Sequence, residues 1–129
     1  EPFLISSSVI AVIAQRLVRV LCPHCKEAYR PAEPIVQSLG IIPEQLDDRA
    51  IYRAKGCEQC IHTGFKGRIG IFEIMVMNEP MKGLILQSFD SNRIKKQAVQ
   101  DGMITLRHDG IQKVLDGVTT IEEILRVAS

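Results

Sequence analysis

Cys22-Pro23-His24-Cys25 and Cys57-Glu58-Gln59-Cys60 are the two stretches that decide the fold of this 129-residue chain, and they hold all four of its cysteines. In a C-x-x-C turn both thiolates can face one ion, while amides of the turn donate hydrogen bonds to the sulfurs. Two such turns supply four soft ligands, a closed tetrahedral set that suits zinc and leaves no open coordination position. The sequence therefore predicts a structural zinc site formed by Cys22, Cys25, Cys57 and Cys60.

Other uses of the four cysteines stay open at this point. Iron in a rubredoxin-like site takes the same ligand set, so the spacing does not separate the two metals. Two disulfides would need an oxidising compartment, and no stretch of the chain resembles a secretory signal. A thioredoxin-type redox motif uses a single C-x-x-C pair, so the second pair argues against it. Zinc is favoured over iron, disulfides and unbound thiols.

The composition indicates a soluble, cytosolic, globular protein. The 16 basic and 15 acidic residues leave a net charge of +1, which creates no overall field for nucleic acid or an anionic membrane. Four phenylalanines, two tyrosines and no tryptophan offer few surfaces on which bases could stack. The apolar run from Val9 to Ala14 is far shorter than the roughly 20 residues that span a bilayer. We expect no nucleic-acid partner and no direct membrane insertion.

The patterns along the chain predict an α+β fold that is mainly helical. Apolar residues from Val9 to Leu21 recur at helical spacing after three serines that can cap a helix, so a helix is expected over about residues 6–21. Because that helix would be apolar around most of its circumference, we expect it to pack on more than one side. We therefore expect the chain to be a fragment of a larger protein, whose other parts would supply the surfaces on which this helix packs.

The remaining elements are expected in short pieces. Between the cysteine pairs the sequence predicts a helix closed by Gly40, a weak helix after Pro43 and a strand at Ile51–Arg53. Strand residues follow at 69–77, and four helices follow that strand. Asn78 caps the first of them and Thr120-x-x-Glu123 forms a capping box for the last. The predicted segments are a helix at 1–21, a four-cysteine subdomain at 22–66, a strand segment at 67–77 and a helical bundle at 78–129.

No catalytic grouping is recognisable in the sequence. It contains neither a G-x-x-x-x-G-K-[ST] loop nor a G-x-G-x-x-G turn. The histidines His24, His62 and His108 do not have the spacing of a metalloprotease helix, and no serine or cysteine nucleophile has a base at a recognisable distance. The stretch by itself is not a complete enzyme.

Two segments carry a family resemblance. The pattern G-C-x-x-C-x-x-T-G-F-x-G-R-x-G-I-F-E, over residues 56–73, is similar to the second-knuckle segment of the hexameric ATPases of type II secretion and type IV pilus assembly. Residues 1–22 are similar to the segment that leads into its first knuckle. The resemblance covers the whole chain, and the combination of the two segments is highly specific.

The resemblance implies the C-terminal part of a RecA-like ATPase domain, with a small zinc-knuckle insertion and a C-terminal helical bundle. Residues 1–21 would then end the upstream nucleotide-binding core, and residues 67–77 would return to it. ATP and magnesium would be bound by motifs of the parent protein that precede this chain, so the fragment alone would not be an ATPase. Arg68 matches a position associated with the nucleotide base. An arginine that balances the thiolate charge is an equally good interpretation of Arg68.

For the parent protein the resemblance implies a cytoplasmic homo-hexamer that is peripheral to the inner membrane. It would couple ATP hydrolysis to the extrusion of pseudopilin or pilin subunits. The expected partners are an inner-membrane platform protein and a cytoplasmic adaptor of the same machine. The cysteine pairs favour secretion or pilus assembly over pilus retraction. The rival hypothesis is a stand-alone zinc-stabilised adaptor that binds another protein.

Overall fold

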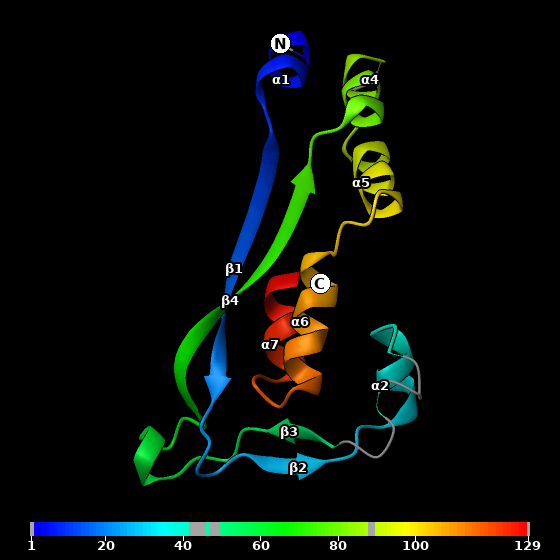
Figure 1. Ribbon diagram of the computed structural model, residues 1–129. Helices are drawn as coiled ribbons and strands as arrows, with labels where there is room; N and C mark the ends of the chain where they lie inside the picture. Colours follow the sequence, from blue (N-terminus) through cyan, green and yellow to red (C-terminus); the bar gives the residue numbers. More distant parts are fainter. Residues whose placement is uncertain (1, 42–45, 47–49, 88–89, 129) are drawn as a thin grey trace. The chain divides into compact units, whose positions relative to one another are not determined.

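The structure is a computed structural model that describes residues 2–41, 46, 50–87 and 90–128. Helices outnumber strands within these ranges, which confirms a mixed α+β fold (Figure 1). The helix predicted after Pro43 lies outside the described residues. The elements in chain order are α1 (Pro2–Ser8), β1 (Ala11–Leu21), β2 (Glu27–Tyr29), α2 (Glu33–Ser38), β3 (Ile51–Arg53), the 3-10 turn η1 (Glu58–Cys60), β4 (Phe65–Val76), α4 (Glu79–Gln87), α5 (Ser91–Gln100), α6 (Leu106–Leu115) and α7 (Ile121–Ala128).

The prediction of a helix over residues 6–21 is wrong. Helix α1 ends at Ser8, and Ala11–Leu21 form strand β1, which pairs with β4 in a two-stranded sheet. Figure 1 shows the two strands running in opposite directions. Val12, Ile13, Val18 and Val20 of β1 have branched side chains, which fit a pleated strand better than a helix. Pairing with a strand far along the chain therefore overrides the local helical spacing.

The chain divides into two compact units. Unit 1 comprises Glu1–Gln15 and Phe72–Leu106, and unit 2 comprises Arg16–Ile71 and Arg107–Ser129. In unit 1, helix α1 packs on α4 and α4 packs on α5. The core of unit 1 consists of Met81, Ile85 and Ala98, with Ile5, Met75, Met77, Ile94 and Met103 packed against them.

Unit 2 holds both cysteine pairs and is built around the end of β1, the start of β4 and helices α6 and α7. Strands β2 and β3 form a short antiparallel ribbon in which Tyr29 lies opposite Ile51. This confirms the strand predicted at Ile51–Arg53. Helices α6 and α7 approach closely at Gly110, where a Cβ would lie 2.7 Å from Cδ1 of Ile124. Val18, Ile51, Ile71, Val114 and Ile124 of this unit are almost fully buried.

All four helices predicted after residue 78 are present, and their predicted starts are largely correct. The amide oxygen of Asn78 accepts a hydrogen bond from the Met81 amide at 2.9 Å, and the Thr120 hydroxyl accepts one from the Glu123 amide at 3.1 Å. However, α4 and α5 belong to unit 1, whereas α6 and α7 belong to unit 2. The single helical bundle expected over residues 78–129 is therefore divided between two units. No described helix has the length and apolar character needed to cross a membrane.

Candidate metal centre

The four cysteine sulfurs form one cluster in unit 2. All four Sγ atoms lie within 4.8 Å of one another, and none of the cysteines is in a disulfide. The Sγ atoms of Cys22 and Cys57, of Cys25 and Cys60, and of Cys57 and Cys60 are each 3.8 Å apart. The fold therefore brings together all four predicted ligands, from two turns separated by the β2, α2 and β3 segment.

The separations fit a tetrahedral ion. Four sulfurs at about 2.3 Å from a central zinc would lie about 3.8 Å apart in a regular tetrahedron. Three of the sulfur pairs have that spacing, and Cys22 and Cys60 are buried from solvent. The donor set is four thiol sulfurs, which is the set that structural zinc sites use. The residues present thus fit the predicted zinc.

Local backbone hydrogen bonds hold the two turns against each other. The Cys22 amide donates to the carbonyl of Gly64 at 2.9 Å, which joins the first knuckle to the chain just after the second. The Lys26 amide donates back to the Cys22 carbonyl at 3.1 Å, and the His62 amide donates to the Cys57 carbonyl at 2.7 Å. Each knuckle is thus a turn closed by a backbone hydrogen bond, which holds the backbone that carries its two cysteines.

Backbone amides also stabilise charge on the sulfurs, as the sequence predicted. The Cys60 sulfur accepts from the amides of Cys57 at 3.3 Å and Gly64 at 3.1 Å, and the Cys25 sulfur accepts from the amide of Gly56 at 3.3 Å. Burial by itself raises the pKa of the Cys60 thiol. The two amides, with the thiols of Cys57 and Cys25, outweigh burial and lower the pKa of Cys60 to about 6.

The pKa of the Cys25 thiol shifts in the opposite direction. Burial, reinforced by hydrogen bonds with the neighbouring thiols, outweighs the single amide of Gly56 and raises the pKa of Cys25 to about 11. These contacts therefore favour the thiolate at Cys60 and the neutral thiol at Cys25. A bound cation would reverse this preference, because it stabilises every thiolate that it contacts.

Two of the basic residues near the cysteines, Lys26 and Lys55, contact groups other than the sulfurs. The Lys26 ammonium donates to the carbonyl of Gly117 at 3.0 Å and lies 4.4 Å from the centre of the Tyr52 ring. Lys55 pairs with Glu27 at 3.4 Å. Lys26 therefore fastens the turn between α6 and α7 to the residues that follow the first knuckle.

Arg68, the predicted nucleotide-binding residue, lies on β4 and is exposed. Within the described part of the chain, none of the hydrogen bonds to the sulfurs comes from Arg68. His24 and His62 are exposed, and the cluster of potential ligands in the described ranges contains cysteines alone.

A buried carboxylate in unit 2 has a role that the sequence did not reveal. The Glu123 side chain is 3% exposed and accepts from the Arg19 amide at 2.7 Å, from Nε of Arg19 at 3.1 Å and from Nε of Arg126 at 2.9 Å. The capping box in the sequence predicted that this carboxylate would bond to its own helix start. It instead joins α7 to β1, through an arginine that also stacks on Phe65 at 4.0 Å.

The same region contains further bonds between β1 and the turn before α7. The Leu21 amide donates to the Val118 carbonyl at 2.8 Å, and the Thr119 hydroxyl donates to the Arg19 carbonyl at 2.7 Å. Leu21 immediately precedes Cys22, the first of the four predicted ligands. The position of the first knuckle is therefore tied directly to the α6–α7 turn.

Fold and site together define a mixed α+β chain with four clustered cysteines that could hold a metal ion. A family model described as "Type II/IV secretion system protein" matches residues 1–126. The chain therefore belongs to the type II/IV secretion system protein family, which confirms the resemblance found in its sequence.

Curated relatives agree with this membership. The chain is 46% identical over 127 residues to "Type II secretion system protein E" of Pseudomonas aeruginosa, covering 98% of this chain and 25% of the relative. It is 41% identical over 125 residues to "Type IV pilus assembly ATPase PilB" of Thermus thermophilus, covering 97% and 14%. It is 42% identical over 132 residues to "Type IV pilus assembly ATPase TfpB" of Acinetobacter baylyi, covering 98% and 22%. The chain thus spans a quarter or less of the length of these relatives.

Proposed function

We propose that this chain is the zinc-bearing C-terminal segment of a secretion or pilus-assembly ATPase. The observation that carries the proposal is the family match over residues 1–126, together with relatives whose names are those of secretion and pilus-assembly proteins. In this proposal the parent protein couples ATP hydrolysis to the extrusion of pseudopilin or pilin subunits. A stand-alone zinc adaptor is not favoured, because the relatives that the chain matches are much longer proteins with those names.

The parent supplies nucleotide chemistry that this sequence lacks, since no G-x-x-x-x-G-K-[ST] loop occurs in it. We infer that ATP and magnesium bind in a RecA-like core to which β1 and β4 belong. Exposed apolar side chains on these strands support that inference. Ile13, Ile74 and Val76 are 64%, 49% and 62% exposed in unit 1. A two-stranded sheet with such a face is marginal in water and is stabilised when further structure covers it.

The role proposed for the metal is mechanical. When bound, zinc supplies four bonds that lock the two knuckles together without taking part in hydrolysis. The residues of this chain extend that lock, because Leu21 and Lys26 donate hydrogen bonds to Val118 and Gly117 in the α6–α7 turn. A displacement of β1 in the ATPase cycle would then move the knuckles and α7 together.

We propose that the parent is a cytoplasmic hexamer at the inner membrane, with the platform protein and a cytoplasmic adaptor as partners.

The proposal is tested with the complete protein that contains this chain. Purified full-length protein is expected to hydrolyse ATP, and deletion of its gene is expected to abolish either type II secretion or surface pili. A gene copy with Cys57→Ser and Cys60→Ser should fail to restore the lost process. Secreted enzyme activity and pilus counts distinguish the two machines. A full-length protein without ATPase activity, whose deletion leaves both processes intact, would contradict the proposal.

We further propose that Arg68 contacts the nucleotide in the parent protein. Because a guanidinium can stack on a base and hydrogen-bond to phosphate, Arg68→Ala is expected to raise the KM for ATP about tenfold. Lys66 is the matched control, since it is also exposed and lies two residues earlier on β4. Lys66→Ala should leave KM unchanged. Equal KM values for the Arg68→Ala variant and the wild type would remove Arg68 from the nucleotide site.

A further inference from the structure

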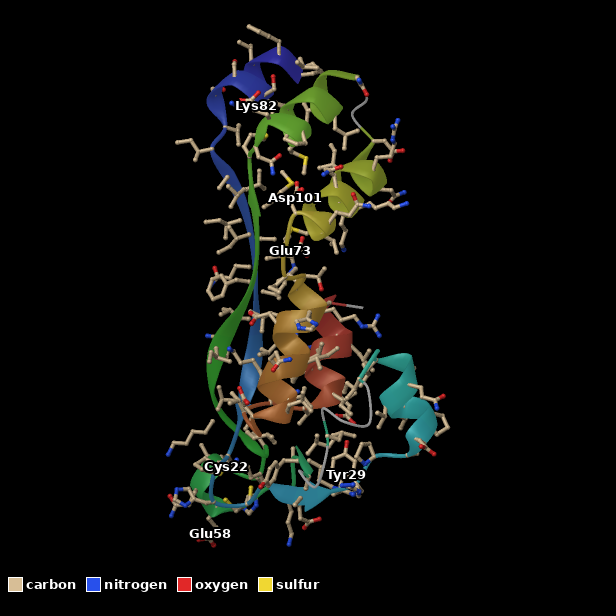
Figure 2. The ribbon with its side chains drawn as sticks, turned by 45° about the vertical axis from the view of Figure 1, so that its right-hand side comes forward. Cys22, Tyr29, Glu58, Glu73, Lys82 and Asp101 are labelled. Carbon is tan, nitrogen blue, oxygen red and sulfur yellow. The ribbon has the colours of Figure 1, made fainter. Side chains whose placement is uncertain are left out.

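The turn between α6 and α7 meets two residues that lie beside the cysteine pairs, and all three contacts fall on Gly117. The ammonium of Lys26 donates to the Gly117 carbonyl at 3.0 Å and lies 4.4 Å from the centre of the Tyr52 ring. A Cβ at Gly117 would lie 3.1 Å from Cδ2 and Cε2 of Tyr52 and 3.3 Å from Nζ of Lys26. In Figure 2 the segment from Cys22 to Tyr29 runs along the end of the helix pair where α6 turns into α7.

The turn is a closed structure that requires glycine at this point. Gly117 has φ of 76°, in the left-handed region that favours glycine. Its amide donates to the Val114 carbonyl at 3.0 Å, and the Val118 amide donates to the Lys113 carbonyl at 2.9 Å, so these bonds end α6. A carbonyl past the end of a helix has no partner in that helix. The one at Gly117 accepts from Lys26 instead.

The contacts that hold the turn come from two different parts of unit 2. Lys26 and Tyr52 belong to residues 26–56, the segment between the two cysteine pairs, and each lies close to one pair in the sequence. Other bonds come from β1, which precedes both pairs; the Leu21 amide, for example, donates to the Val118 carbonyl at 2.8 Å. The turn is therefore held partly by a strand and partly by the segment whose two ends carry the predicted metal ligands.

A metal would fix the ends of that segment. An amide–sulfur hydrogen bond from Gly56 to Cys25, at 3.3 Å, crosses between the two pairs. Metal–sulfur bonds to all four cysteines would hold both ends of residues 26–56 more firmly than this contact does. A lysine side chain loses much rotamer freedom when it is ordered, so its hydrogen bond is most favourable where its backbone is already held. The bond from Lys26 to Gly117 should therefore be stronger in the metal-bound protein.

We propose that Lys26 couples metal binding to the docking of the α6–α7 turn. A bound metal strengthens the contact of Lys26 with Gly117, and by thermodynamic linkage the docked turn strengthens metal binding by the same factor. Lys26 is a positioning residue, because its side chain contacts the turn and Tyr52 rather than a sulfur. The inference rests on the zinc site of the proposed function and names what regulates it. It does not depend on hydrolysis of ATP by the parent.

The first measurement is the zinc affinity of the full-length protein, by competition with a chromophoric chelator. Lys26→Met keeps an unbranched side chain and loses the ammonium. It is expected to bind zinc about tenfold more weakly, the effect of losing a hydrogen bond from a charged group. Lys55→Met is the matched control, because it removes the same charge two residues before Cys57, and the ion pair of Lys55 is with Glu27 rather than with the turn. It should bind zinc as the wild type does.

The second measurement is hydrogen exchange of the α7 amides in the full-length protein, with zinc bound and with zinc removed. In the wild type, zinc should slow α7 exchange about tenfold, and in Lys26→Met this effect of zinc should disappear. Thr119→Val is the control, because it removes the hydroxyl bond from the turn to the Arg19 carbonyl on β1 and leaves Lys26 intact. It should speed exchange equally in both states and keep the tenfold effect of zinc.

Unchanged zinc affinity in Lys26→Met would overturn the proposal. An equal loss of affinity in Lys55→Met would overturn it as well, since the cause would then be charge near the sulfurs. Faster α7 exchange in Lys26→Met by the same factor with and without zinc would reduce Lys26 to a structural contact and contradict the coupling. A wild-type protein that binds no zinc would end both this inference and the proposed zinc site. ATPase activity of the same preparations tests the proposed function independently.

Discussion

Replacement of Cys60 by serine is expected to lower the metal content of the full-length protein from one zinc per chain to almost none. Cys60 is 5% exposed and is the sulfur that receives two backbone amides, from Cys57 and Gly64. A serine hydroxyl is a poor zinc ligand at neutral pH, because metal binding would require its deprotonation. Structural zinc contributes about 10–16 kcal/mol to small zinc-binding peptides, which exceeds the stability of many whole domains.

The knuckles should therefore open when zinc is lost, whether by Cys60→Ser or by a chelator. Elemental analysis measures the metal, and limited proteolysis between residues 22 and 64 measures the opening. His24→Ala is the control, because His24 lies inside the first knuckle but is exposed and outside the sulfur cluster. It should keep its zinc and resist protease. Full zinc occupancy in Cys60→Ser would show that the four sulfurs are not the ligand set. If the wild-type protein contained iron and absorbed visible light, the bound metal would be iron and not zinc.

Replacement of Glu123 by glutamine is expected to weaken the attachment of α7 to β1 by about 2–4 kcal/mol. The buried Glu123 carboxylate accepts from the amide and guanidinium of Arg19 and from Arg126. A neutral amide loses the charge that both arginines face and cannot accept all of these bonds. Hydrogen exchange of α7 amides in the full-length protein measures the loss as roughly thirtyfold or more faster opening.

The stability that the Glu123 carboxylate contributes should depend on pH. Burial alone would raise the pKa of Glu123, but the hydrogen bonds from Arg126 and Arg19 outweigh it and lower the pKa from 4.5 to about 2. A depressed pKa means that the charged form stabilises the fold. This stabilisation is fully present above about pH 4.5 and disappears as the pH falls towards 2. The shift corresponds to about 3 kcal/mol.

Protection of α7 should therefore differ most between wild type and Glu123→Gln above pH 5, and the two should converge as the pH falls from 4.5 to 2. Glu122→Gln is the matched control, because Glu122 is the exposed neighbour on the same helix. It should behave as wild type at every pH. A constant difference between wild type and Glu123→Gln throughout this range would show that charge on Glu123 is not the cause.

The cysteine cluster was predictable because most of its determinants are local. Each C-x-x-C pair holds two sulfurs within one turn, and the absence of any other cysteine leaves one way to complete a set of four. The amides of Cys57 and Gly64 lie within four residues of the Cys60 sulfur that accepts from them, whereas the Gly56 amide donates across 31 positions to Cys25. The helix starts at Asn78 and Thr120 were predictable for the same reason, since a capping side chain bonds to an amide three residues away.

By itself the sequence determined which four cysteines would cluster, the short strand at Ile51–Arg53, the C-terminal helices and the family. Only the tertiary structure decided that residues 11–21 form a strand, because the energy of pairing with β4 comes from residues remote in the chain. It also decided that Glu123 faces Arg19 across 104 positions of sequence rather than its own helix start. At Ile61 the side chain disfavours the left-handed backbone, and the hydrogen bonds of the knuckle impose it. Each of these outcomes depends on contacts whose partners no local pattern can identify.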